Sequence, residues 1–186
     1  MADEITHRMA LTAHTATQCA AVQNLHAHVA TPRQGVLALR YTLHADMSRI
    51  RVVLEGTASP GRTDGLWKHT CFEAFIRPDD SPGYYELNFS AAKQWAAYRF
   101  DAYREGMVAV ELPHAPEVSV RYTARDLELD ALVSLPFAYT TQSIPRPRLA
   151  LTAVVEEDSG RLCYWSARHP EGKPDFHHPD SYVIEL

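Results

Sequence analysis

The sequence predicts an all-β protein, a β-sandwich of jelly-roll type with few short helices. Three observations support this class. Short segments alternate between apolar and polar residues, and clusters of glycine, proline and aspartate separate these segments. In addition, no segment longer than about ten residues shows a convincing 3.6-residue apolar period, so helices are expected to be rare. Many short strands between turn signals are typical of sandwiches and jelly rolls.

The expected strands follow one another along the whole chain. We expect strands at residues 8–16, 35–45, 50–54, 66–76, 84–90, 95–100, 107–112, 118–122, 127–135, 149–155, 161–166 and 181–186, and leave 18–30 open between strand and coil. The first is a weakly alternating edge strand. Residues 35–45 are the clearest, because every second residue from Leu37 to Leu43 is apolar and falls on one face. Residues 50–54 are a short β-branched run.

The later segments are separated by strong breakers. Residues 118–122 and 127–135 both alternate, and we expect them to form a hairpin. Pro145 and Pro147 keep the following connection out of regular structure. Residues 149–155 are apolar on both faces, as expected for a central strand.

Residues 62–107 carry most of the candidate functional side chains. Successive side chains of a strand point to opposite faces, so the polar and apolar sets can be separated by register. The expected core set is Phe72, Ala74, Ile76, Tyr85, Leu87, Phe89, Ala96, Tyr98 and Phe100. The opposite face is expected to present Trp67, Glu73, Glu86, Asn88 and Trp95 together. Such an aromatic and polar platform suits a polar ligand with apolar faces, such as a sugar.

Composition narrows the partners. A chain of 186 residues suits a single domain with its own core, and 46% hydrophobic and 22% charged residues are ordinary for a soluble globule. A net charge of -5 without a basic cluster argues against nucleic acid. No run of about 18 apolar residues is present, so no membrane partner is expected. A small-molecule ligand is expected, and the oligomeric state is left open.

The cysteines and the N-terminus indicate a cellular compartment. Cys19, Cys71 and Cys163 show no CxxC spacing and cannot all pair, which favours a reducing environment. The first sixteen residues contain no apolar core of a signal peptide. We therefore expect a cytoplasmic protein.

Four motifs carry a family resemblance. The segments LWKHTCFEAFI, YYELNFS, WAAYRFDAYREGM and YWSARHPEGKPDFHHPDSY resemble the bacterial proteins described as DOMON-like, which are related to family 9 carbohydrate-binding modules. The resemblance spans the chain from about Gly35 onward. It implies a single DOMON-like β-sandwich domain over residues 1–186 that binds a ligand on its concave face. Ligands in the broader superfamily are sugars or haem.

The resemblance also implies which residues bind. Trp67 and Glu73 match the start of the family's ligand-face strand, Asn88 matches the neighbouring strand, and Trp165 is the candidate for a second aromatic wall. The missing signal peptide favours a small intracellular sugar derivative over a polysaccharide. The predicted function is non-catalytic binding of a carbohydrate or sugar derivative. The predicted ligand-binding residues are Trp67, Glu73, Glu86, Asn88, Trp95, Arg104, Trp165, His169, Lys173, Asp175 and His177.

Two catalytic alternatives are compatible with the residues present, although no catalytic residue is predicted. Glu73 and Glu86 on adjacent strands offer the two carboxyl groups that a glycoside hydrolase needs. Carboxylates on a sheet face more often bind a ligand or an arginine. Cys71 with His69 offers a nucleophile and a base, but no third group that would orient the base is evident.

No cofactor is predicted, although a divalent metal and haem stay as alternatives, as does a protein-interaction module. The C-terminal segment gathers five metal-binding side chains, His169, Asp175, His177, His178 and Asp180. No HExxH spacing is present, however, and Lys173 interrupts the group, so no metal ligand is assigned. Met107 and the histidines are candidate haem ligands, but CxxCH is absent.

Overall fold

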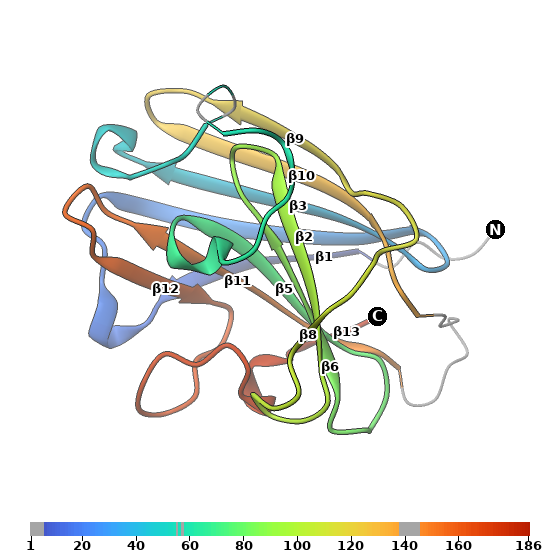
Figure 1. Ribbon diagram of the computed structural model, residues 1–186. Coiled ribbons are helices and arrows are strands. Elements are labelled where there is room, and N and C mark those ends of the chain that lie inside the picture. The colour runs from blue at the N-terminus through green and yellow to red at the C-terminus, as the bar shows by residue number, and fades with distance from the viewer. Residues whose placement is uncertain (1–5, 55, 57, 138–145) are drawn as a thin grey trace.

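The computed structural model describes residues 6–54, 56, 58–137 and 146–186 (Figure 1). The expected irregular connection at Pro145 and the first five residues of the N-terminus lie outside this part of the chain. Four 3₁₀ turns are the only helices among the described residues, and none of them is long or apolar enough to cross a membrane. The expected all-β class is confirmed.

The strands and turns have the following bounds. The strands are β1 (Thr6–Ala13), β2 (Val22–Arg33), β3 (Val36–Ala45), β4 (Gly61–Arg62), β5 (Cys71–Arg77), β6 (Tyr84–Phe89), β7 (Gln94–Phe100), β8 (Val108–Ala109), β9 (Glu117–Tyr122), β10 (Asp126–Ser134), β11 (Arg148–Glu156), β12 (Leu162–Ser166) and β13 (Ile184–Glu185). The 3₁₀ turns are η1 (Thr15–Thr17), η2 (Met47–Arg49), η3 (Leu66–Lys68) and η4 (Pro179–Ser181).

One hydrogen-bonded path links the strands in the order β4-β7-β6-β5-β11-β12-β1-β2-β3-β10-β9. Strand β1 joins two halves, because Thr6 to Leu11 pair with β2 whereas Thr12 and Ala13 pair with β12. We call β12, β11, β5, β6 and β7 the β7 half, and β2, β3, β10 and β9 the β9 half. Pairing is antiparallel except between β4 and β7.

The two halves pack against each other around one apolar core, so the expected β-sandwich is confirmed. Leu39 of β3 and Leu129 of β10 belong to the same buried cluster as Leu87 of β6 and Leu151 of β11. Burying apolar side chains between two sheet layers is what stabilises a sandwich. The finer jelly-roll connectivity stays a prediction.

Several element bounds differ from the expectation. Strand β5 begins only at Cys71, because the chain first forms η3 after Gly65, whose φ of 77° lies in the left-handed region. The β-branched run at 50–54 makes only an isolated bridge from Ile50 and is no strand, since propensity alone supplies no neighbouring ladder. The expected edge strand β1 is an internal strand with partners on both sides. Residues 18–30, left open, contain most of β2.

The expected sorting of side chains is correct for β5 and β6 and wrong for β7. Trp95 lies in the sandwich core, while Tyr98 and Phe100 lie on the outer face. The register agrees, since Glu86 is opposite Tyr98. Apolar residues occupy both parities of β7, because this strand is buried on both faces, so alternation carried no information about its orientation.

A second, smaller apolar cluster covers the outer face of the β7 half. Phe75, Tyr84 and Phe100 from the strands pack there with Phe176 and Tyr182 from the C-terminal segment. This segment, residues 167–182, follows β12 and forms the dark red loops at the lower edge of Figure 1. The sheet of the β7 half therefore has the sandwich core on its inner face and the C-terminal segment on its outer face.

Candidate functional site

A pocket of about 540 Å³ lies on the outer face of the β7 half, beneath the C-terminal segment. Strands β5, β6 and β7 supply Glu73, Phe75, Glu86 and Phe100 to its lining. The C-terminal segment contributes four further lining residues, Lys173, Pro174, Phe176 and His177. The remaining lining residues are Trp67, Arg104, Met107, Val154 and Tyr164. Its volume is within the range of small-molecule sites, roughly 300–1,000 Å³.

Two carboxyl groups lie side by side on the strand wall. In the ladder, Glu73 is opposite Asn88 and Glu86 is opposite Phe75, so the two acids are diagonal neighbours on one face of β5 and β6. Burial, reinforced by the charge of Glu86, raises the pKa of Glu73 well above its ordinary value. Burial also raises the pKa of Glu86, to about 7, although the Asn88 amide and the Arg104 charge oppose the shift. Burial therefore favours the protonated form of Glu73, and Glu86 is close to its midpoint at neutral pH.

The carboxyl groups retain unused hydrogen-bonding capacity. Asn88 Nδ2 donates to Glu86 Oε1 at 2.8 Å, and Thr152 Oγ1 donates to Glu73 Oε2 at 3.4 Å. Glu73 Oε1 and Asn88 Oδ1 are buried and have no hydrogen-bond partner among the described protein atoms. A buried polar atom without a partner is costly, so Asn88 Oδ1 favours a ligand or water that donates to it, and Glu73 favours one that forms a hydrogen bond with its carboxyl group.

His177 is held as a neutral imidazole at the edge of this wall. Burial, followed by the nearby Arg104 charge, lowers its pKa to about 4. The Tyr84 hydroxyl accepts from the Arg104 backbone N–H at 3.2 Å and lies 2.7 Å from His177 Nδ1, to which it can donate. In that arrangement Nε2 carries the proton. His177 Nε2 is 3.9 Å from Glu86 Oε2, too far for a hydrogen bond and suited to a bridging ligand hydroxyl.

Arg104 is positioned by its backbone and by Asp175. Its φ of 58° is uncommon for a residue with a side chain. Arg104 Nη2 donates to Asp175 Oδ1 at 2.7 Å, and Tyr103 donates to the other Asp175 oxygen. Burial acts to raise the pKa of Asp175, but the Tyr103 and Arg104 contacts hold it below its usual value. Asp175 thus orients the Arg104 guanidinium group, whose positive charge acts on Glu86.

Trp67 forms a half-buried aromatic wall. It belongs to η3, and its ring meets the Tyr98 ring edge-on at a centroid distance of 5.6 Å. Tyr98 itself is fixed by a 2.8 Å hydrogen bond from its hydroxyl to Asp64. The pocket therefore combines an aromatic surface with acceptors and donors, the combination that recognises a polar ring with apolar C–H faces.

The structure brings together six of the eleven predicted binding residues in the pocket lining. These are Trp67, Glu73, Glu86, Arg104, Lys173 and His177. Asn88 and Asp175 stand behind them as hydrogen-bond partners. Whether any of these residues binds a ligand stays a prediction.

Three predicted residues lie elsewhere, which corrects their assignment to the site. Trp95 and Trp165 point into the sandwich core, because their positions in β7 and β12 have inner-face parity. His169 donates from Nε2 to the Thr12 carbonyl at 2.8 Å and packs against His14. His169 is close to Lys173 in the sequence, but the chain turns between them, so His169 lies outside the pocket lining.

Several residues of the site are not predicted from the sequence. Phe75 lines the pocket and Tyr84 contacts the lining residue His177, but the sequence pattern gives neither a role. Phe100, expected in the core, also lines the pocket. Tyr164 and Phe176 complete the aromatic lining. Phe75 and Tyr164 occupy strand positions that alternate with core residues, whereas the loop segment that carries Phe176 shows no such pattern.

Two alternative constellations are not assembled. His69 Nδ1 contacts Glu156 Oε2 at 2.7 Å, whereas the Cys71 thiol is fully buried and contacts the Phe72 carbonyl. The C-terminal histidines and aspartates do not converge on a common point, since the one group of converging metal-ligand atoms found among the described residues contains none of them. His69 is therefore not placed to act as a base on Cys71, and the C-terminal segment presents no converging group of metal ligands among the described residues.

Comparisons with known proteins bear on the fold. Neither models of protein families nor curated proteins match the sequence. A proposed carbohydrate-binding protein from Bacteroides uniformis ATCC 8492 is 14% identical and aligns over 96% of this chain and 84% of its own, with a TM-score of 0.66. A family 9 carbohydrate-binding module from Caldicellulosiruptor kristjanssonii, in complex with cellotriose, is 9% identical over 90% of this chain and 75% of its own, with a TM-score of 0.54.

Likeness at these identities concerns the fold alone. It relates the chain in architecture to a family 9 carbohydrate-binding module, while membership of the DOMON-like group stays a prediction. The chain therefore has the β-sandwich fold that these two proteins share.

Proposed function

We propose that the chain binds a small carbohydrate or sugar derivative in the pocket of the β7 half and does not transform it. One observation carries the proposal: Glu73 Oε1, a buried oxygen without a hydrogen-bond partner among the described protein atoms, belongs to the lining of a pocket that also has aromatic sides, and the equally unpartnered Asn88 Oδ1 belongs to its ladder neighbour. Sugar hydroxyls are donors and acceptors, and sugar C–H groups pack on aromatic faces.

The arrangement assigns each side chain a task. The half-exposed Trp67 ring takes the apolar face of the sugar. Glu86 accepts hydrogen bonds from its hydroxyls, the protonated form of Glu73 can donate to a hydroxyl oxygen as well as accept, and a further hydroxyl bridges His177 Nε2 and Glu86 Oε2 across their 3.9 Å separation. Asn88 holds the Glu86 carboxylate in place. Arg104 and Lys173 line the same pocket and add positive charge, which favours sugar phosphates or sugar acids within this class.

The fold supports the same ligand class. One protein of this fold is a carbohydrate-binding module described with cellotriose, and another is proposed to bind carbohydrate. Sites are built on folds and fold alone does not assign a ligand, so the pocket chemistry is the stronger support.

A glycoside hydrolase is the second candidate, and the raised pKa of both Glu73 and Glu86 favours it, because a glycosidase needs one protonated carboxyl group. Glycosidases place their two carboxyl groups on opposite sides of the scissile bond. Here the two groups are diagonal neighbours on one wall, which fits joint ligand binding better. Turnover of chromogenic glycosides that is lost in both Glu73→Gln and Glu86→Gln would favour the hydrolase.

Haem fits the pocket less well. Met107 and His177 both line it, but haem requires an apolar slot, and two carboxyl groups occupy this wall. A Soret band that appears when haem is added to the protein would reverse this preference.

The proposal is tested by calorimetry with a panel of monosaccharides, short oligosaccharides and sugar phosphates. We expect saturable one-site binding by at least one member, weakened at least tenfold in Trp67→Ala and in Glu86→Gln. Glu128→Gln is the matched control, because it makes the same chemical change on β10 of the β9 half. Absence of binding across the panel, or equal affinity in all three variants and the wild type, would refute the proposal.

A further inference from the structure

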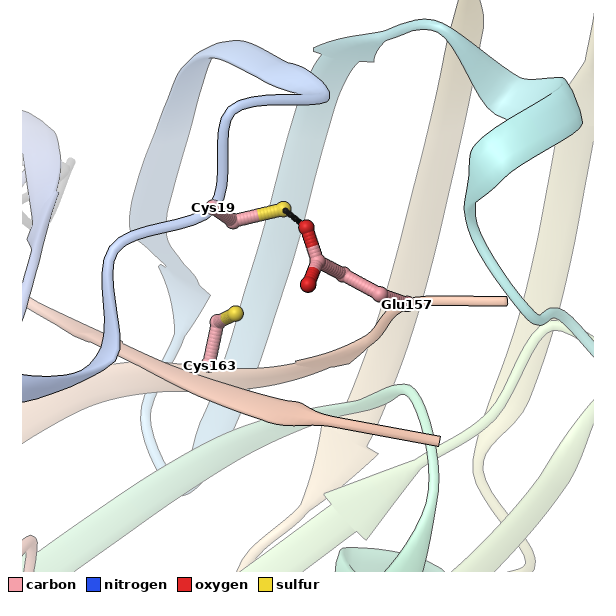
Figure 2. Close-up of side chains that lie close together, drawn as sticks. All are labelled: Cys19, Glu157 and Cys163. Carbon is pink, nitrogen blue, oxygen red and sulfur yellow. Dashed lines mark hydrogen bonds between the residues drawn. The ribbon is translucent and has the colours of Figure 1, made fainter. Parts of the chain in front are cut away.

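Two thiols and a carboxylate that do not belong to the pocket lining converge at a second place in the fold. The side chains are Cys19 from the segment before β2, Glu157 directly after β11, and Cys163 of β12 (Figure 2). Their ligand atoms all lie within 4.8 Å of one another, and all three residues are buried. No second group of three or more such residues converges in this way within residues 6–54, 56, 58–137 and 146–186. We propose that Cys19, Glu157 and Cys163 form a binding site for a soft divalent cation of the Zn²⁺ type.

The donor set selects the kind of cation. Thiolate sulfur is a soft ligand that prefers Zn²⁺ and its heavier relatives, whereas Mg²⁺ and Ca²⁺ require oxygen ligands. Two sulfurs and one carboxylate oxygen supply three corners of a tetrahedron, and water takes the fourth. Cys19 and Glu157 are 6% and 7% exposed, so solvent reaches the edge of this group, whereas Cys163 is fully buried.

Arg161 prepares the carboxylate for this role. Its Nε donates to Glu157 Oε2 at 2.7 Å, while the other oxygen, Oε1, lies 3.3 Å from Cys19 Sγ. The Arg161 hydrogen bond is the main reason why the pKa of Glu157 is lowered, so this carboxylate stays ionised. A ligating carboxylate is commonly held by such a second partner, which leaves one oxygen for the cation. Arg161 is therefore a positioning residue.

The affinity of this site for a cation is expected to depend on pH. Both thiols are buried, and a thiol must lose its proton before its sulfur binds a cation as a thiolate. Binding thus releases two protons, and the affinity rises with pH. The charged groups that face the site are Arg161 and Arg49, which favour the anionic ligands.

The position of the group indicates a structural role. Cys19 and Cys163 belong to the sandwich core, whereas the pocket lies on the other face of the β7 half. A cation here would tie the segment before β2 to the turn between β11 and β12. Because it binds the folded chain, it stabilises that state by mass action. The inference does not depend on the proposed sugar binding.

The experiment titrates the reduced, chelator-treated protein with Co²⁺ and Zn²⁺. We expect one equivalent of Co²⁺ to give a thiolate charge-transfer absorption that Zn²⁺ displaces, with affinity rising as pH is raised. Cys19→Ser and Cys163→Ala should each abolish the absorption, and Arg161→Gln should weaken affinity by about tenfold while keeping one equivalent. Cys71→Ala is the matched control, since its thiol is equally buried but lies outside the group, and it should bind normally.

Circular dichroism confirms that each variant is folded, and the wild-type titration decides the question even if one variant is not. Three results would overturn the proposal: no Co²⁺ absorption in the reduced wild-type protein, an absorption that persists in folded Cys19→Ser, or one that is lost in folded Cys71→Ala. A purified protein two mass units lighter, with a Cys19–Cys163 disulfide that resists reduction, would also count against it.

Discussion

The two faces of strands β5 and β6 are both buried, but they are buried by different structures. The inner face presents Phe72 and Leu87 to the sandwich core, and the outer face presents Glu73 and Glu86 to a pocket roofed by a loop segment. All four side chains are at most 5% exposed. Exposure alone therefore does not separate core from site, whereas the chemistry of the side chains does.

The inner and outer faces of β5 and β6 differ because one is covered by a second sheet and the other by a loop segment. Packing one sheet on another excludes water, and any unpaired polar atom there is costly. A loop leaves a cavity, in which oxygens such as Glu73 Oε1 can be satisfied by a ligand or water. On the outer face, burial raises the pKa of Glu73 and Glu86 and thereby lowers the stability of the protein. Such perturbed carboxyl groups are typical of functional sites.

The largest contrast is expected between two tryptophans. Trp95→Ala should lower the free energy of unfolding by about 3–5 kcal/mol, because it removes a large ring from the sandwich core. Trp67→Ala, at the half-exposed pocket wall, should cost less than about 1.5 kcal/mol and instead lower sugar affinity. Urea unfolding and calorimetry on the same samples measure both effects. The reverse ranking would mean that the faces are wrongly assigned.

Glu86→Gln should stabilise the protein in a pH-dependent way. The folded-state pKa of about 7 lies above the ordinary value of 4.5, so the wild-type carboxyl costs stability once the pH exceeds 4.5, and the cost levels off above about 7. The stability of the variant relative to the wild type should therefore rise by roughly 3 kcal/mol between pH 4 and pH 8. Unfolding curves across this range measure it.

The substitution alters the hydrogen bond between residue 86 and Asn88 at both pH values, so its contribution to stability cancels when the two pH values are compared. Glu128→Gln on β10 serves as the control and should show no comparable rise. A flat difference for Glu86→Gln would show that this carboxyl is not desolvated in solution.

Tyr84→Phe should cost about 1 kcal/mol of folding free energy, because the His177 imidazole and the Arg104 backbone N–H both lose a partner. If the proposed ligand contact at His177 is correct, affinity should also fall several-fold while the circular dichroism spectrum is unchanged. Tyr85→Phe offers a comparison at the adjacent position, whose side chain packs on the inner face. Equal loss of affinity in both variants would argue against a specific role for the Tyr84 hydroxyl.

The smallest expected effect is the pH dependence of ligand affinity. A neutral sugar should bind a few-fold more weakly as the pH falls from 8 to 6, because Glu86 is protonated through its pKa of about 7 and loses an acceptor. Calorimetry at constant ionic strength measures this dependence. It should disappear in Glu86→Gln, and persistence there would assign the titration to another group.

Local patterns in the sequence determined the fold class and most of the strands. The hairpin of β9 and β10, the half-buried β3 and the orientation of β5 and β6 follow from alternation, because in each of them one parity is clearly more apolar. The proximity of Glu73, Glu86 and Asn88 follows from the same two-residue period and from pairing of consecutive strands. These features depend on short-range chemistry that every window of the sequence contains.

Tertiary structure alone decided which way β7 faces and what encloses the site. Trp95 and Tyr98 are both compatible with either face, and only pairing with β6 and packing against the second sheet place them. The contact of His177 with Tyr84, and that of Cys19 with Glu157, join residues 93 and 138 positions apart. Such contacts form because distant segments share one buried space, and a local pattern carries no information about which segments will do so.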